Sequence, residues 1–264
     1  MSDYLELSSY AQSYFSLMEK ANANGHYVNV STITLICVLN TQHIDLNQIV
    51  STFNHDDVHL KVPPCKTETT KSQKKTFYNQ ITLNYRDISN KSIKIFSNGK
   101  LQITGLTCFF ECKFVLEKIV RWLNEWFQTT DFAVVNAYVG MLNINFSVQH
   151  TIDLQSLNRL LNSYDNVMAV YNPETYPAIN VKLQTSEFML DSNPSISLFI
   201  FGTGNIVVSG TKTIEQSIFA YEFIVDVLNR TPSILRVRKE RKIDSTTKFI
   251  DGYAARQYIS CIGE

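Results

Sequence analysis

The sequence predicts an α+β fold built from two tandem copies of one unit, and three observations support this. Two segments 105 residues apart share one strand–turn–strand pattern. The stretches upstream of both segments also correspond, and a segment with the apolar spacing of an amphipathic helix closes each unit. Antiparallel strands with helices segregated onto one face make an α+β architecture. Two such units in tandem would share one continuous curved antiparallel sheet with the helices on its convex face.

Each unit is expected to begin with a strand and a short capped helix. Residues 30–49 read VSTITLICVLNTQHIDLNQI, and residues 139–157 read VGMLNINFSVQHTIDLQSL. Both stretches carry an Asp-Leu pair before a helical pattern, at Asp45 and Asp153. An aspartate side chain at this position accepts hydrogen bonds from the first free backbone N–H groups of a helix. The two residues therefore predict two N-caps.

The most clearly repeated feature is the strand–turn–strand pattern itself. Residues 93–105 read IKIFSNGKLQITG, and residues 198–210 read LFIFGTGNIVVSG. Both read apolar-x-Ile-Phe, a short turn region, Gly and a run that ends in Ser/Thr-Gly. The alternation of apolar and polar residues in KLQITG (100–105) has the period of 2 that is typical of a strand. Gly99 and Gly204 stand at the turns, where glycine supplies the positive φ that tight hairpins need. One hairpin is therefore predicted in each unit.

One more strand and a longer helix are expected in each unit. Residues 78–85, YNQITLNY, correspond to residues 176–183, YPAINVKL, as the strand before the hairpin. Apolar residues at helical spacing mark the closing helices. They are Phe110, Phe114, Leu116, Ile119, Val120 and Leu123 in the first unit, and Ile218, Phe219, Phe223, Ile224, Val227 and Leu228 in the second.

These elements divide the chain into four parts. We expect an N-terminal helical extension at 1–26, a first repeat at 27–130, a second repeat at 131–230, and a C-terminal tail at 231–264 that opens with the basic run RVRKERK. A polar stretch at 62–75 is expected to be a loop inserted in the first repeat, since loops tolerate added residues. The basic run fits a solvated helix face as well as a nucleic-acid or localisation patch.

The composition is that of a globular protein of 264 residues, 44% of them apolar. The 24 Lys and Arg residues balance 24 Asp and Glu residues, so no global positive field draws the chain to nucleic acid, although a local basic face is compatible with this balance. The five cysteines lack the spacing of a disulfide scaffold, which predicts reduced thiols. The chain has no signal-peptide pattern and no run of 18 apolar residues, so we expect neither secretion nor a membrane span.

The sequence predicts no enzymatic site, no metal site and no cofactor. Serine and cysteine residues lack a readable base or oxyanion context, and neither a Walker pattern nor a dinucleotide-binding glycine pattern occurs. The stretch HDDVH at 55–59 and the pair Cys108 and Cys112 come nearest to metal-ligand spacing. We expect a polar loop in the first case and packed or free thiols in the second.

At this point the repeated motifs resemble the saddle domain of the TATA-binding protein (TBP) family. That family shows a Tyr-x-Pro-Glu-x-Phe-Pro segment and an Ile-Phe-x-x-Gly-Lys-x-x-x-Thr-Gly-Ala-Lys segment. The second unit is similar at the same spacing, with YNPETYPAINVKL (171–183) and IFGTGNIVVSGTK (200–212), and the first matches through VSTITL (30–35) and IFSNGKLQITG (95–105). The resemblance covers residues 27–230. It implies a divergent member, of the kind a large DNA virus would encode.

The resemblance implies a transcription initiation factor that binds and bends promoter DNA through the minor groove. Such proteins wedge aromatic rings between base steps at both ends of the site. Here the implied intercalating residues are Phe96 and Phe201, partnered by Tyr78 (or the adjacent Phe77) and Tyr176. Further DNA contacts are implied for Val30, Thr32, Arg86, Lys100, Gln102, Thr104, Val139, Met141, Lys182, Val207, Ser209 and Lys212.

The implied partners are A·T-rich double-stranded promoter DNA and general transcription factors or RNA polymerase subunits. The implied place of action is the nucleus or a cytoplasmic viral factory, with the virion as a further location. The protein is expected not to be secreted and not to contact a membrane.

Several departures from the family pattern leave a second function open. The family's central asparagines are replaced by Val28 and Ala137, and Asn29 and Asn136 are strand neighbours that should point to the opposite face. The lysine that follows the hairpin glycine is Asn205 in the second unit. The wedge phenylalanines would also fit a hydrophobic core. The alternative is a TBP-fold scaffold that has lost DNA recognition and binds transcription machinery. A positive concave face would favour DNA, and a neutral or acidic face would favour the scaffold.

Overall fold

The structure is a computed structural model that describes residues 5–62, 79–87, 89–184 and 195–237. Its helices are α1 (Leu5–Ala23), α2 (Leu46–Thr52), α3 (Phe109–Phe127), α4 (Leu154–Leu161) and α5 (Ile214–Arg230), with a 3-10 turn, η1 (Pro232–Ile234). Its strands are β1 (Val28–Leu39), β2 (Val58–Lys61), β3 (Gln80–Arg86), β4 (Asn90–Phe96), β5 (Lys100–Leu106), β6 (Val134–Ser147), β7 (His150–Ile152), β8 (Val167–Val170), β9 (Ala178–Gln184), β10 (Ser195–Phe201), β11 (Asn205–Thr211) and β12 (Leu235–Val237).

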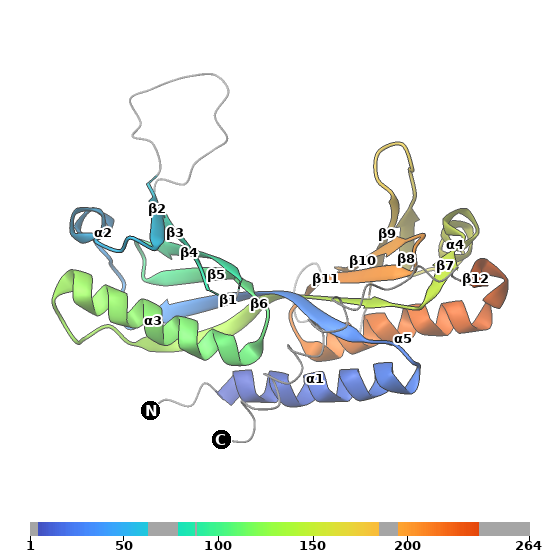
Figure 1. The fold of residues 1–264 in the computed structure, drawn as a ribbon, viewed down its shortest axis with the longest axis horizontal. Coiled ribbons are helices and arrows are strands. Elements are labelled where there is room, and N and C mark those ends of the chain that lie inside the picture. The colour runs from blue at the N-terminus through green and yellow to red at the C-terminus, as the bar shows by residue number, and fades with distance from the viewer. Residues whose placement is uncertain (1–4, 63–78, 88, 185–194, 238–264) are drawn as a thin grey trace.

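Ten of these strands form one antiparallel sheet in the order β2-β3-β4-β5-β1-β6-β11-β10-β9-β8. The long strands β1 and β6 pair at the centre, and the same arrangement repeats outward on both sides. In Figure 1, α1, α3 and α5 lie on one side of the sheet, and both ends of the sheet curve away from them. The predicted α+β fold with one continuous curved sheet is therefore confirmed.

The predicted caps and turns are present. Asp45 accepts hydrogen bonds from the backbone of Asn47 and Gln48 at the start of α2, and Asp153 caps α4 in the same way. Gly99 has φ +79° and Gly204 has φ +86°, the left-handed values that the hairpin prediction requires. The antiparallel pair β7 and β12, which lies beside the second half, was not predicted.

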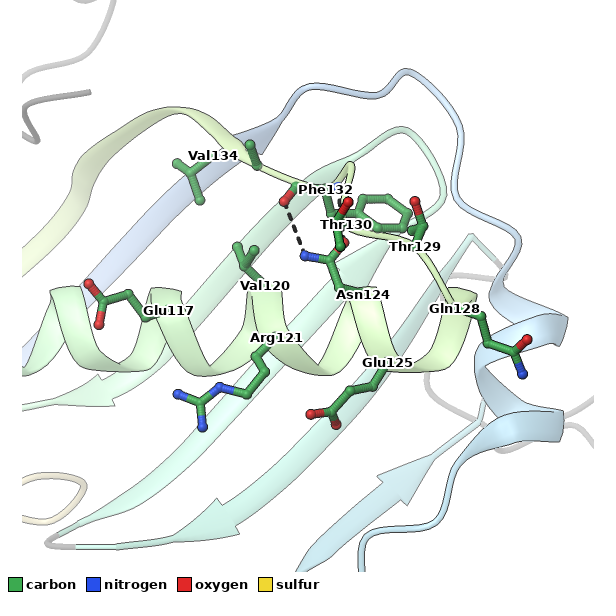
Figure 2. A pocket seen from close by; sticks show the side chains of 11 residues that line it. Glu117, Val120, Arg121, Asn124, Glu125, Gln128, Thr129, Thr130, Phe132 and Val134 are labelled. Carbon is green, nitrogen blue, oxygen red and sulfur yellow. Dashed lines mark hydrogen bonds between the residues drawn. The ribbon is translucent and has the colours of Figure 1, made fainter. Parts of the chain in front are cut away.

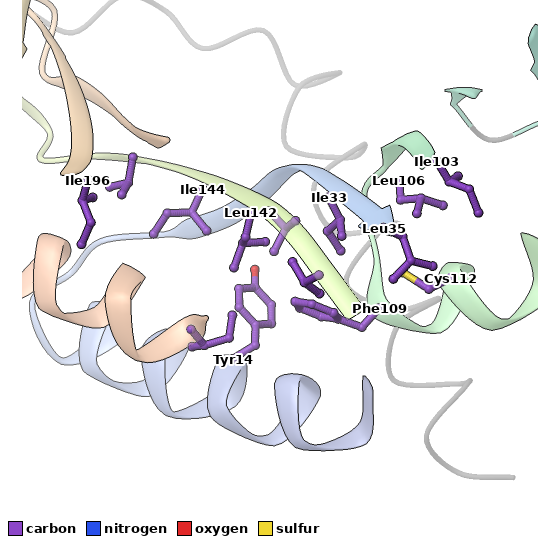
Figure 3. Packing of buried hydrophobic residues seen from close by; sticks show 14 of the residues in the cluster. Tyr14, Ile33, Leu35, Ile103, Leu106, Phe109, Cys112, Leu142, Ile144 and Ile196 are labelled. Atoms are coloured by element: carbon purple, nitrogen blue, oxygen red, sulfur yellow. The ribbon is translucent and has the colours of Figure 1, made fainter. Parts of the chain in front are cut away.

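The hydrophobic core lies between the sheet and the helices on its convex side. Figure 3 shows Tyr14 of α1 and Phe109 of α3 beneath the central strands, near Leu142 and Ile33. These two strand residues are completely buried, and Phe109 is 2% exposed. Because β1 and β6 belong to different repeats, this packing joins the two halves into one core.

The helix α1 contacts both closing helices. The ring of Tyr10 stacks on Phe109 of α3 with 5.6 Å between the ring centroids. Lys20 forms an ion pair with Glu222 of α5, and the Tyr14 hydroxyl donates to the Val28 carbonyl at 3.2 Å. The N-terminal segment, predicted to be helical, therefore spans the two repeats on the convex side.

The junction between α1 and β1 should make stability depend on pH through His26. Its Nδ1 lies 2.9 Å from the Tyr221 hydroxyl, and its ring stacks on Phe146. Burial, reinforced by nearby His150, lowers the pKa of His26 below its usual 6.5. The folded state therefore binds fewer protons than the unfolded state just below pH 6.5, so the free energy of unfolding falls as the pH is lowered through this range.

Urea unfolding at pH 7.5 and at pH 5.5 measures this effect. The variant His26→Gln should lose less stability than the wild-type protein between the two pH values, since it has no imidazole to protonate. An equal loss in both proteins would show that other groups cause the pH dependence.

Two details of the first repeat differ from the sequence-based expectations. Phe114, expected among the apolar residues of its helix that mark the core side, is 67% exposed. The HDDVH stretch is not only a polar loop, because His55 packs on Trp122 with 5.1 Å between ring centroids and β2 begins at Val58. Cys112 is buried, and neither it nor Cys108 takes part in a disulfide. Among the residues that the structure describes, no helix is long and apolar enough to cross a membrane.

Candidate nucleic-acid interface

The candidate interface is the sheet surface opposite α1, α3 and α5, which we call the open face. Strand residues alternate between buried positions facing the helices and more exposed positions facing away. In β4, for example, Ile93 and Ile95 are completely buried, whereas Lys94 and Phe96 are partly exposed. The pairing registers then identify the residues of neighbouring strands that lie on the same face, since directly opposed residues point to the same side.

The two implied wedge phenylalanines lie on the open face, one in each half. Phe96 ends β4 and pairs with Gln80, and Phe201 ends β10 and pairs with Ala178. Both rings are partly exposed, so neither belongs to the buried core. Tyr176 is 46% exposed, with its ring centroid 6.1 Å from that of Phe201. Tyr78 and Phe77, the implied partners of Phe96, lie outside the described residues.

Most of the other implied contact residues also lie on the open face. They are Thr32, Gln102, Thr104, Met141, Val207 and Ser209 along the sheet, and Arg86, Lys100 and Lys182 at exposed positions. The Thr104 hydroxyl donates to the Ser92 carbonyl at 3.3 Å, so its proton already has an acceptor. Lys212 lies elsewhere, between β11 and α5, where its carbonyl accepts a hydrogen bond from Tyr10 of α1.

The placement of Val30 and Val139 on this face is wrong. They are only 5% and 3% exposed and belong to the core on the helix side. The pairing of β1 with β6 shifts register between Val30 and Thr32 and again near Val139, as at a β-bulge. A bulge inserts one residue and reverses which side chains face the core.

The same strands bring two asparagines onto the open face that were expected to point away from it. Asn29 lies between the buried Val28 and Val30 and pairs with Asn145. Asn136 pairs with Val38 and is exposed. The expectation that the centre of the open face lacks asparagines is therefore wrong, because the residues next to Val28 and Ala137 supply them.

The strands that form the open face carry basic side chains and, among the described residues, no acidic ones. None of the described strands contains an aspartate or a glutamate. The open face carries Lys61, Arg86, Lys94, Lys100 and Lys182, whereas the acidic residues of the described chain lie on helices and loops. An overall balance of charge thus conceals a locally basic surface, which raises the local concentration of anions.

Three residues of this face were missed by the sequence interpretation. Phe199 lies beside Tyr176 with 6.1 Å between ring centroids, and Lys61 and Lys94 face the same side as Thr82. The sequence does hold a signal for two of them. Lys94 and Phe199 occupy matching positions in the repeated hairpin, two residues before Phe96 and Phe201.

Comparisons with known proteins find similarity to TATA-binding proteins in sequence and in fold. The family model described as "Transcription factor TFIID (or TATA-binding protein, TBP)" matches residues 133–231, within the second half. The "TATA-box-binding protein-like" protein of Acanthamoeba polyphaga mimivirus is 29% identical over 265 residues, which cover 84% of this chain and 70% of that protein. The "TATA-box-binding protein" of Methanococcus maripaludis is 28% identical over 142 residues, 52% of this chain and 67% of the relative.

A solved structure shows the same fold. The chain "Methanococcus jannaschii TBP" superposes with a TM-score of 0.52 at 16% identity, covering 77% of this chain and 98% of that chain. This chain is TBP-like: it is similar to TATA-binding proteins in sequence and in fold. The similarity to a mimivirus protein supports the viral character that the divergence implied. The similarities together support a role as a TBP-like transcription factor.

The helix side of this TBP-like protein carries a surface hollow of about 930 Å³ along α3. Figure 2 shows Arg121, Glu117 and Glu125 on the outer side of the helix, while the Asn124 amide donates to the Phe132 carbonyl. The hollow contains both signs of charge and lies on the opposite side of the sheet from the wedge residues. It is therefore separate from the candidate interface.

Neither the HDDVH stretch nor the pair Cys108 and Cys112 belongs to a cluster of metal-ligating side chains in the TBP-like protein. Within the described ranges, no three His, Cys, Asp or Glu side chains are placed to hold a metal ion. The Cys112 thiol points to the Cys108 carbonyl at 3.6 Å, and burial raises its pKa to about 12. A thiol that resists deprotonation in this way is a poor metal ligand.

Proposed function

We propose that this TBP-like protein binds double-stranded promoter DNA on the open face and bends it through the minor groove. The observation that carries the proposal is the presence of aromatic rings in both halves of a face that no described helix covers and whose described strands contain no carboxylate. Flat apolar rings can enter between base steps and unstack them, and lysines and arginines displace the counterions of the phosphates.

Polar groups at the centre of the face support the same proposal. Asn29 and Asn145 oppose each other on the paired strands β1 and β6. An amide can donate to the A N3 and T O2 acceptors that A·T pairs present in the minor groove. A preference for A·T-rich duplexes is therefore proposed, with Asn29 and Asn136 as readers together with Ser209 and Thr32.

The basic open face also bears on the scaffold alternative. A scaffold that had lost DNA recognition would not need to keep carboxylates out of every described strand. General transcription factors or polymerase subunits are proposed as partners of the helix side, where acidic residues such as Glu117, Glu215 and Glu222 are exposed. Both interactions would take place at viral promoters, in the nucleus or in a cytoplasmic viral factory.

A DNA-bending assay by fluorescence transfer on an A·T-rich duplex tests the proposal. The wild-type protein should shorten the end-to-end distance of the duplex, and the double variant Phe96→Ala/Phe201→Ala should bind more weakly by about 1–3 kcal/mol for each lost ring. Phe114→Ala is the matched control, since this ring is exposed on the helix side.

The control should bind and bend as the wild-type protein does. If the double variant also binds and bends DNA like the wild type, the wedge assignment is wrong. If the wild-type protein shows no salt-dependent binding to any duplex, the proposed function itself is wrong.

A further inference from the structure

The two halves present different chemistry at matching places on the open face. In the first half, pairing registers align Lys61, Thr82, Lys94 and Gln102 in one row across β2, β3, β4 and β5. In the second half, the matching row across β8, β9, β10 and β11 is Val170, Asn180, Phe199 and Val207. We call these the lysine row and the phenylalanine row.

The two rows match because the repeat fixes their positions. Lys94 and Phe199 are 105 residues apart, as are Gln102 and Val207, which is the offset of the repeated hairpin. Both rows begin on an edge strand of the ten-stranded sheet, β2 in one half and β8 in the other, and these strands lie at opposite ends in Figure 1. The comparison is therefore between equivalent positions of one fold.

The charge of the lysine row favours the binding of an anion. Lys94 is flanked by the neutral side chains of Thr82 and Gln102, and among the described residues no ion pair involves it or Lys61. A partly buried ammonium group without a carboxylate is costly unless an anion is supplied from outside. Phosphate groups of a duplex on this face would supply it.

The phenylalanine row is built to meet an apolar surface. The ring centroid of Tyr176 lies 6.1 Å from those of both Phe199 and Phe201, so the second half carries three neighbouring rings. Val170 adds a side chain that is 58% exposed at the edge strand. Contact with sugars or with unstacked bases would stabilise such a cluster most, since every base has a π-face on which an aromatic ring can stack.

Building on the proposed function, we propose that the two halves bind DNA through different contacts. Lys61 and Lys94 hold phosphates at the end of the first half, and Phe199 joins Phe201 and Tyr176 in unstacking bases at the end of the second half. Lys94 and Phe199 thus determine whether each end contacts mainly phosphates or mainly bases. The duplex is consequently opened more at the phenylalanine row than at the lysine row.

The test measures two quantities on one A·T-rich duplex that carries 2-aminopurine at successive positions. The fluorescence of 2-aminopurine reports unstacking, and the slope of log K against log salt reports phosphate contacts. Lys94→Leu should reduce the magnitude of the slope by up to about 0.9, with little effect on fluorescence. Phe199→Leu should weaken binding on the order of tenfold and reduce the fluorescence gain, with the slope unchanged.

Exchanged side chains and a matched control complete the design. Lys94→Phe should raise the fluorescence gain while it lowers the slope, and Phe199→Lys should do the reverse. Lys113→Leu removes an exposed charge from α3 on the helix side and should change neither quantity.

Each result has one meaning. If the wild-type protein binds and bends DNA but the Lys94 and Phe199 variants change the salt slope and the fluorescence alike, the proposed difference between the halves is wrong. The proposed function then stands. If the wild-type protein fails to bind any duplex, the proposed function fails first. Opposite effects of the two substitutions would support the inference.

Discussion

Replacing Gly204 with alanine should destabilise the protein by more than about 3 kcal/mol. Its φ is +86°, and a Cβ at this position would lie 2.0 Å from the His150 carbonyl oxygen. The turn cannot move away easily, because Val148 N–H donates to the Gly204 carbonyl and Ile152 N–H donates to the Gly202 carbonyl, both at 3.0 Å. The substitution therefore combines backbone strain with a collision against backbone.

Gly25→Ala is the matched control for this prediction. Gly25 also has positive φ, +69°, but apart from its two chain neighbours no described residue has a heavy atom within 4 Å of the position that its Cβ would take. It should therefore show only the backbone cost of the left-handed conformation, about 1–2 kcal/mol. Urea unfolding followed by circular dichroism gives both values. A cost at Gly204 no larger than that at Gly25 would contradict the proposed role of the close approach.

The same experiment tests whether the two halves unfold together. Both tryptophans of the chain, Trp122 and Trp126, lie on α3 in the first half. If the shared core makes unfolding cooperative, tryptophan fluorescence should report the same shifted midpoint as circular dichroism, although Gly204 lies in the second half. Separate midpoints would indicate that the halves unfold independently.

The sequence predicted those parts of the fold that depend on local signals. Gly99 and Gly204 fixed the hairpins because few other residues tolerate positive φ, and Asp45 and Asp153 fixed the starts of two helices because their side chains replace missing backbone acceptors. The recurrence of these residues in two copies turned weak local signals into a prediction of the whole sheet. The β7 and β12 pair has no counterpart in the described part of the first repeat, so the repeat could not reveal it.

The candidate site was most predictable where strict strand alternation holds. Phe96 and Phe201 end strands whose pairing shows no register shift, and they lie on the open face as the resemblance implied. Val30 and Val139 lie near register shifts of β1 and β6, where one residue more or less exchanges the two faces. Such a bulge depends on the pairing of two distant strands, which a single sequence does not display.

Lys91→Ile should be the second strongly destabilising substitution, at a cost of about 3–5 kcal/mol. Lys91 is completely buried on the helix side of β4, an unusual position for a charge. Its Nζ lies 2.7 Å from Asp87 Oδ1 and 2.5 Å from Glu111 Oε1, and it donates to the Ser89 hydroxyl. Removing the ammonium group leaves the Glu111 carboxylate, only 11% exposed, without its counter-charge.

The second half shows how the same place is filled without charge. At the offset of 105 residues, Ile196 stands at the position of Lys91 and is 3% exposed, and Gln216 stands at the position of Glu111. Gln216 Oε1 accepts a hydrogen bond from Lys212 N–H, just as Glu111 Oε2 accepts one from Thr107 N–H. Either an amide or a carboxylate oxygen can therefore accept the backbone N–H hydrogen bond just before the helix.

The double variant Lys91→Ile/Glu111→Gln should consequently recover most of the stability lost by Lys91→Ile. It copies the second half into the first, keeps the acceptor for Thr107 N–H, and leaves only Asp87, which is 36% exposed and can be hydrated. Replacing a buried ion pair by apolar packing is often neutral or stabilising, whereas removing one partner is not. Urea unfolding of the wild type, both single variants and the double variant forms a thermodynamic cycle that isolates the coupling. If the double variant is as unstable as Lys91→Ile alone, the cost comes from packing at Lys91 and not from an unpaired carboxylate.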